Sequence, residues 1–217
     1  MKIGGIDMKK GTVVSLKSLR IKELVLKNNC FVWLSVLFIA GMICGTFLCV
    51  KTKILYDFSL KYTAHFESVR KGAGFLNVLF NSFMSDLLVI LAIFGLGTSM
   101  LGVVLVPLFS AFNGLLCGSV SAYLYSEYAV KGIAFSAVLI VPAAIIFIIA
   151  FLLAAREAVK FSLLIGKLSL PGHPAVNISA DFKCYCGKYL VVCLVVIVSA
   201  VADAVLSCTF LEKLALH

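Results

Sequence analysis

The chain has 217 residues, of which 62% are hydrophobic and only 13% are charged. A water-soluble domain of this length cannot hide so much apolar surface in one core, so the composition predicts a protein built into a lipid bilayer. The formal net charge of +9 argues little for nucleic-acid binding, because no basic stripe interleaved with exposed aromatic residues marks a soluble module. Anionic lipid headgroups account for the same charges more simply.

The amino-terminal segment, residues 1–29, is basic and carries seven Lys or Arg residues. It is followed by a charge-free stretch at residues 30–50, whose 21 residues match one bilayer crossing of about 20 residues. The stretch lacks a convincing small-residue cleavage site before Lys51, which favours a retained anchor over a secretory signal. We therefore expect a basic cytoplasmic segment at 1–29 and a single multi-pass membrane domain at 30–217.

Two contrasting segments come next. Residues 51–86 mix Phe and Tyr with charges and small residues, a composition typical of an amphipathic helix lying at the membrane interface. Residues 87–126 then carry no Asp, Glu, Lys or Arg, and Pro107 lies in their middle. Because forty residues match two crossings, this stretch predicts two transmembrane helices joined by a very short turn near Pro107.

The remaining charge-free stretches are residues 132–155 and 189–211, the latter interrupted only by Asp203. Between them, residues 156–188 open as a continuation of the preceding helix and break at Pro171-Gly172-His173-Pro174. The predicted fold class is all-α: a polytopic membrane helix bundle of about five transmembrane helices plus interfacial helical loop segments. The predicted spans are about 30–50, 85–105, 108–126, 132–155 and 189–211.

Five crossings place the two ends of the chain on opposite sides of the membrane. Allocated to alternating sides, twelve of the 19 basic residues fall on the amino-terminal side and seven on the other. By the positive-inside rule, this predicts a cytoplasmic amino terminus and an extracytoplasmic carboxy terminus.

Catalytic and metal-binding motifs are missing from the sequence. There is no His-Glu-x-x-His, Gly-x-Ser-x-Gly or Walker-type loop, and the three histidines lie outside the predicted spans. Cys184, Cys186 and His173 offer three metal ligands, but a structural zinc site takes four at recognised spacings. We predict no enzymatic activity, no catalytic residues, no cofactor and no metal.

Small residues recur at four-residue spacing within the predicted spans. The first span has Gly41 and Gly45, and the second has Gly95 and Ser99. The third carries an unbroken file along one face, made of Ser110, Gly114, Gly118 and Ala122. Such files let helix backbones approach closely, which in lipid is a principal source of association, so we expect a compact bundle.

Two polar residues inside the spans require an explanation. Asn113 lies beside the file of small residues, and Asp203 lies in the fifth span with Ser199 and Ser207 four residues to either side. An Asp near a helix centre costs about 2.5 to 3.5 kcal/mol on insertion scales, so Asp203 should face protein or water, or carry a proton. A packed polar contact, an ion relay and a partner contact all fit this pattern.

Several of these segments resemble the stage II sporulation protein M family. The second span contains Phe94-Gly95-Leu96-Gly97-Thr98-Ser99, the third contains Phe112-Asn113-Gly114, the fourth contains Pro142, and the last contains Asp203. The resemblance covers most of the chain from residue 30 onward. The chain departs from the family after Pro142, where Ala143-Ala144-Ile145 stands in place of a polar or charged residue.

The resemblance implies a role in engulfment during endospore formation, at the sporulation septum or the engulfing membrane. It implies a non-enzymatic scaffold that anchors and localises two extracytoplasmic peptidoglycan-cutting proteins, D and P of the same stage. The docking surface would be residues 51–86, residues 127–131 and the outer end of the fifth helix. An oligomer is compatible with the small-residue files. The candidate packing or partner contacts are Gly41, Gly45, Gly95, Asn113, Gly114, Gly118, Pro142 and Asp203.

One alternative belongs to a different class of protein. A small transporter or channel could use Asp203, Asn113 and the serines as a polar path across the membrane. The sequence shows a single ionisable residue within a span and no inverted repeats with broken helices, which argues against it. A membrane-embedded hydrolase ranks third, because it lacks histidines in the spans.

Overall fold

A computed structural model describes residues 9–168 and 178–214, with side chains placed in residues 29–168 and 179–210. This part of the chain is helical throughout apart from short turns, as the sequence predicts. The elements in chain order are α1 (Lys9–Lys51), α2 (Lys53–Arg70), α3 (Phe75–Gly97), α4 (Gly102–Phe135), the π-helix η1 (Ser136–Ile140), α5 (Val141–Leu168) and α6 (Ile178–Leu214).

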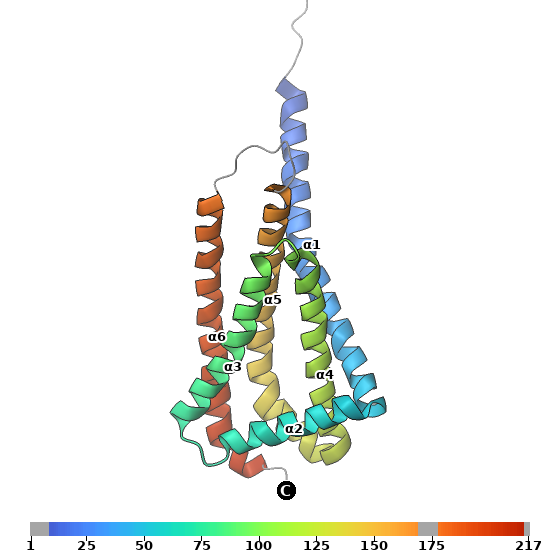
Figure 1. The fold of residues 1–217 in the computed structure, drawn as a ribbon, viewed down its shortest axis with the longest axis vertical. Helices are drawn as coiled ribbons and strands as arrows, with labels where there is room; N and C mark the ends of the chain where they lie inside the picture. Colours follow the sequence, from blue (N-terminus) through green and yellow to red (C-terminus); the bar gives the residue numbers. More distant parts are fainter. Residues whose placement is uncertain (1–8, 169–177, 215–217) are drawn as a thin grey trace, which may run out of the picture.

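Five helices run lengthwise and one lies across the end of the bundle (Figure 1). Helices α1, α3, α4, α5 and α6 alternate in direction, so α1 begins and α6 ends at opposite ends of the bundle. Helix α2 crosses the end at which α6 finishes. The sequence predicts an amphipathic interfacial helix for residues 51–86; α2 occupies the first part of that segment, and α3 occupies the rest from Phe75.

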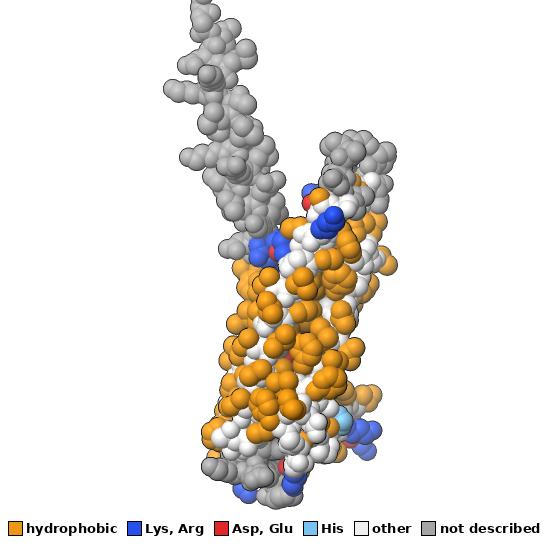
Figure 2. All heavy atoms as spheres, turned by 90° about the vertical axis from the view of Figure 1, so that its left-hand side faces the viewer, with side chains coloured by type: hydrophobic (Ala, Val, Ile, Leu, Met, Phe, Trp, Pro, Cys, Tyr) orange, Lys and Arg blue, Asp and Glu red, His pale blue; other side chains and the backbone are white. Residues whose placement is uncertain are grey.

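Four stretches of the described chain are long and apolar enough to cross a membrane: Asn29–Lys51, Phe75–Gly97, Gly102–Leu168 and Ser179–Phe210. The third has 67 residues and reverses direction between α4 and α5, so it supplies two crossings and the bundle supplies five. Hydrophobic side chains cover the middle of the face in Figure 2, and basic side chains gather towards its two ends. The chain is therefore a multi-pass membrane protein.

The turn between the second and third crossings lies at residues 98–101, which corrects the prediction of a turn near Pro107. Pro107 instead lies inside α4, where it cannot donate a hydrogen bond to the preceding turn. The turn follows Gly97, and Thr98 Oγ1 donates a hydrogen bond back to the carbonyl of Gly95 at 2.7 Å. The turn therefore forms at glycine and short polar residues, and the helix continues through the proline.

Two further boundaries differ from the predicted spans. Helix α3 begins at Phe75, so the second crossing starts within the segment that the sequence assigns to a loop. Helix α6 begins at Ile178 rather than near residue 189, and α5 continues to Leu168, as its charged continuation predicts. The predicted break at residues 171–174 lies outside the described residues. Charged residues hid these extensions, because the spans were identified by the absence of charge. Asp86 lies in the middle of α3, and Asp181, Lys183 and Lys188 lie in the first part of α6.

The reversal between α4 and α5 is built on an unusual backbone. Ala129 has φ 44° and ψ −121°, a conformation that is costly for a residue with a side chain. The π-helix follows, and the backbone N–H of Val141 bonds to the carbonyl of Ser136, five residues earlier. Pro142 comes next and has no N–H to donate, so the irregular turn lies where a proline would disturb a regular helix.

Apolar side chains form two separate cores. The larger joins all five lengthwise helices and includes Phe38, Ile93, Val106, Phe151 and Val196. The smaller lies near α2 and centres on Tyr123, Leu124, Phe135 and Leu139, with Tyr56 and Phe66 of α2 packed against it. Helix α2 thus rests on its own small core at one end of the bundle.

Candidate functional site

The closest contact between helices lies between α1 and α4, where glycines meet backbone. A Cβ added to Gly41 would overlap the carbonyl of Ala111, and one added to Gly45 would overlap that of Leu115. The reverse also holds: a Cβ on Gly114 or Gly118 would overlap the carbonyls of Phe38 and Met42. We call this contact the α1–α4 seam. Two glycines on each helix bring the two backbones together without a side chain between them.

Other residues of the predicted small-residue files differ in their roles. Ser110 is fully buried in the seam, and its hydroxyl donates to the carbonyl of Leu34 at 3.4 Å. Ala122 is also buried, so the file on α4 faces protein along its length. Gly95 does not take part in close packing, because nothing lies within 4 Å of where its Cβ would stand. Its neighbour Gly97 packs tightly instead, against Ala158 and the hydroxyl of Tyr185.

Asp203 lies in a buried polar cluster contributed by three helices. Its Oδ2 atom accepts hydrogen bonds from Arg70 Nη2 of α2 at 2.5 Å and from Ser82 Oγ of α3 at 2.5 Å. The same guanidinium nitrogen donates to Ser82 Oγ at 2.9 Å, which closes a triangle. Ser207, one turn further along α6, donates to Oδ1 at 3.4 Å. We call this set the Asp203 clamp, because it ties α2 to α3 and α6.

Burial makes the clamp energetically important. The side chains of Arg70 and Asp203 are each only 10% exposed, so neither charge is well solvated. Removing one partner of such a pair typically costs about 3 to 5 kcal/mol, because the other charge is left buried and unpaired. The guanidinium carbon of Arg70 also lies 3.5 Å above the centre of the Phe66 ring, a favourable cation–π contact.

Two members of this cluster, Arg70 and Ser82, lie in residues 51–86, which the sequence predicts to be a loop. Asp86 ends that segment, and the structure places Ser82 and Asp86 one turn apart on α3. Asp86 is half-buried and lies within electrostatic reach of both Asp203 and Arg70. A signal was present, since the first half of α3 carries polar residues at helical spacing, among them Ser82 and Asp86 four residues apart. Their partner, however, lies more than a hundred residues away in the chain.

A second contact holds the other end of α2. The hydroxyl of Tyr56 donates to Glu127 Oε2 at 2.9 Å, and its ring meets that of Tyr123 edge-on with centroids 5.2 Å apart. The hydrogen bond to the Glu127 carboxylate raises the pKa of the Tyr56 phenol, since a phenolate could not donate it. Helix α2 is therefore fastened near both ends, once by a buried ion pair and once by an exposed hydrogen bond.

The remaining predicted residues lie apart from the Asp203 clamp. Asn113 Nδ2 donates to the carbonyl of Phe109, one turn back in its own helix, at 3.0 Å. Pro142 lies at the beginning of α5, beside Ala143, whose carbonyl accepts a hydrogen bond from Ser199 Oγ of α6 at 3.0 Å. Ser199 and Ser207 thus serve different contacts although they share a face with Asp203.

Cys184, Cys186 and His173 are the three residues that the sequence offers as metal ligands and for which we predict no metal site. Both cysteines are free, and His173 lies outside the described residues. Within residues 9–168 and 178–214, no group of three or more His, Cys, Asp or Glu side chains is placed to hold a metal ion.

An all-helical bundle with five apolar crossings and one crosswise helix defines a polytopic membrane protein. The family model described as Stage II sporulation protein M matches residues 34–207, which is most of the chain. The chain therefore belongs to the stage II sporulation protein M family and is a membrane protein of sporulation. No curated protein and no solved structure matches it.

Proposed function

We propose that this protein is a non-enzymatic scaffold of endospore engulfment, and that the end of the bundle crossed by α2 binds extracytoplasmic partners. By the family resemblance, these partners are the peptidoglycan hydrolases D and P of the same sporulation stage. In this proposal the amino terminus is cytoplasmic, and α2 lies on the extracytoplasmic side of the septal or engulfing membrane. The observation that carries the proposal is the fastening of α2: a helix held at both ends offers a rigid surface.

The faces of α2 differ in a way that suits this role. The inner face carries Tyr56 and Phe66, which pack on the small core. One flank exposes Phe58 and Tyr62, aromatic residues suited to the membrane interface. The face opposite the core is exposed and mostly polar or small, with Asp57, Lys61, Ala64, His65 and Ser68, and it also carries Ile54, which is 84% exposed. This outer face of α2 is available to a partner in water.

Helix α2 depends on its fastenings because its inner face is not purely apolar. Ser59 Oγ and Thr63 Oγ1 are buried there and have no hydrogen-bond partner within the described residues. Burying such groups costs free energy, so the packing of this face alone contributes less than an apolar face would. The Asp203 clamp therefore carries much of the stability with which α2 is held.

A charge-reversal pair of variants tests the proposal. Lys61→Glu reverses one charge on the outer face of α2, and Lys183→Glu reverses one charge on an exposed residue at the opposite end of the bundle. In sporulating cells, the α2 variant should disperse fluorescently tagged hydrolases from the septum, and the control variant should leave them in place. Both variants should remain in the membrane fraction. Normal hydrolase localisation in the α2 variant would contradict the proposal.

The alternative of a polar transport path receives less support. The carboxylate of Asp203 accepts hydrogen bonds from Arg70 and Ser82, and Asn113 donates within its own helix. These polar side chains therefore do not form one continuous hydrogen-bonded path across the membrane. Reconstituted protein with pH-coupled solute flux that disappears in Asp203→Asn would favour the transporter over the scaffold.

A further inference from the structure

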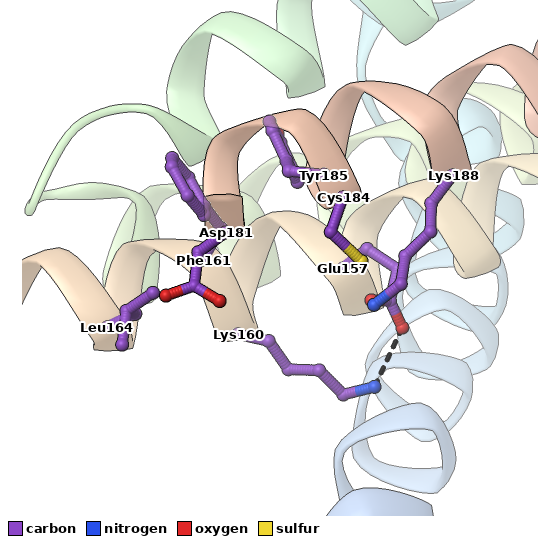
Figure 3. Close-up of a pocket in the computed structure, with 8 residues that line it drawn as sticks. All are labelled: Glu157, Lys160, Phe161, Leu164, Asp181, Cys184, Tyr185 and Lys188. Atoms are coloured by element: carbon purple, nitrogen blue, oxygen red, sulfur yellow. Dashed lines mark hydrogen bonds and ion pairs between the residues drawn. The ribbon is translucent and has the colours of Figure 1, made fainter. Parts of the chain in front are cut away.

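A small pocket opens between α5 and α6 at the end of the bundle opposite α2 (Figure 3). Its volume is about 140 Å³. Phe161 and Leu164 form part of its apolar wall, while Lys160, Lys188, Glu157 and Asp181 supply charges of both signs. None of these residues belongs to the Asp203 clamp or to the proposed docking surface.

Two ammonium groups converge on one carboxylate in this pocket. Lys160 Nζ lies 2.7 Å from Glu157 Oε1, and Lys188 Nζ lies 2.6 Å from Glu157 Oε2 (Figure 3). Each ammonium has three N–H donors, and Glu157 takes one from each. Arg156 adds a third cation, because its Nε lies 3.9 Å from Glu157 Oε1. That nitrogen is buried and has no hydrogen-bond partner within the described residues. Three cations therefore share one carboxylate.

The pocket lies at the depth of lipid headgroups. After Lys188, α6 carries no charged residue until Asp203, so Lys188 marks the edge of the apolar part of this helix. Val191 follows one turn below Lys188 and is 61% exposed, in a position to contact an acyl chain. The surrounding end of the described helices is basic in sequence, since residues 9–28 and 156–188 contain eleven Lys or Arg residues.

We propose that this pocket binds the headgroup of an anionic phospholipid, with the phosphate on Lys160 and Lys188. Basic pockets between transmembrane helices recognise such headgroups because a phosphate is attracted to several cations and can accept hydrogen bonds from each. In the lipid-bound protein the phosphate shares the two ammonium groups with Glu157. Asp181, on the far side of the pocket, accepts hydrogen bonds from headgroup hydroxyls such as those of phosphatidylglycerol.

Calorimetric titration of the full-length protein in neutral detergent tests this proposal, with short-chain phosphatidylglycerol as the probe. Lys188→Gln should weaken binding about fivefold, because one cation near a membrane surface contributes roughly that factor. Glu157→Gln should strengthen binding by a similar factor, since it removes the carboxylate that competes for both lysines. Lys183→Gln, an exposed control outside the pocket, should change the affinity by less than about twofold.

The opposite signs separate lipid binding from a purely structural ion pair. If Glu157 serves only to hold the helices together, Glu157→Gln lowers the thermal stability and does not raise the affinity for phosphatidylglycerol, which overturns the proposal. Equal affinity for phosphatidylcholine or phosphatidylethanolamine of the same chain length also overturns it. Competition by inorganic phosphate at the same concentration would assign the pocket to a free anion instead of a lipid.

Discussion

The α1–α4 seam and the Asp203 clamp both join helices, yet they do so by opposite means. In the seam, glycines remove side chains so that backbone meets backbone, and the stabilisation comes from close contact spread over several turns. In the clamp, a single carboxylate accepts hydrogen bonds from an arginine and a serine that belong to two other helices. The seam depends on local spacing within each helix, whereas the clamp depends on residues far apart in the chain. Mutations should therefore affect the two regions differently.

The largest effect should come from Asp203→Leu, which leaves the charge of Arg70 buried without its carboxylate. We expect the free energy of unfolding to fall by about 3 to 5 kcal/mol in a detergent-based unfolding titration. We also expect the hydrolases to lose their septal localisation while the protein still inserts into the membrane. Arg70→Leu combined with Asp203→Leu is the matched control and should recover most of the stability, because no charge is then left unpaired. A single variant as stable as the unmodified protein would show that the clamp contributes little.

The seam should respond next most strongly, through Gly114→Leu. The new side chain would overlap the backbone of α1 at Phe38, and overpacking of this kind typically costs about 1 to 3 kcal/mol. The same exchange at Gly95 is the control and should cost less than about 0.5 kcal/mol, because open space lies beside it. Thermal unfolding in one detergent compares the two variants directly. We also expect Gly114→Leu to disperse the hydrolases without preventing insertion. Equal losses of stability at the two glycines would contradict the seam.

A smaller effect is expected from Tyr56→Phe, which removes the exposed hydrogen bond to Glu127 and keeps the ring contact with Tyr123. The loss should be about 0.5 to 1.5 kcal/mol, measured by the same unfolding titration. Glu127→Gln retains an acceptor for the phenol and should lose less. If Tyr56→Phe destabilises the protein as much as Asp203→Leu does, the buried ion pair is not the main fastening of α2.

The smallest expected effect is the coupling free energy between a mutation in the seam and a mutation in the clamp. Gly114→Leu and Asp203→Leu share no partner in the described contacts, so their effects on the unfolding free energy should add within about 0.5 kcal/mol. A double-mutant cycle measures the difference. A coupling above about 1 kcal/mol would mean that the seam and the clamp act as one unit.

The sequence predicted the membrane bundle well because long charge-free stretches of about 20 residues or more rarely occur outside a lipid bilayer. Four-residue spacing, which is a property of each helix alone, is what singled out Gly41, Gly45, Gly114 and Gly118, and in the structure these glycines meet the backbone of the neighbouring helix. The position of the turn after Gly97 was harder to predict. Pro107 is the stronger conventional signal, but a transmembrane helix can absorb a proline and end at glycine and short polar residues instead.

Only the need of Asp203 for a partner could be predicted from the sequence, not the identity of that partner. The free-energy cost of burying a carboxylate in a membrane span indicated that Asp203 needs a partner. No feature of the α6 sequence, however, identifies Arg70 or Ser82 as that partner. The pairing depends on how α2 crosses the bundle, which is a tertiary feature. The mixture of aromatic, charged and small residues in 51–86 also made that segment resemble an interfacial loop. Asp86 marked the end of that segment, because the forty residues after it carry no charge.

The sequence separation of the clamp has a consequence for biosynthesis. Arg70 emerges from the ribosome 133 residues before Asp203, which takes on the order of ten seconds at usual rates of synthesis. During that interval α2 has no counter-charge from α6, and only the arrival of the last crossing completes the contact. A truncated or half-inserted chain therefore lacks the fastening at the Arg70 end of α2 and keeps only the Tyr56 end and the small core. Partners that recognise the fully fastened helix would select finished molecules.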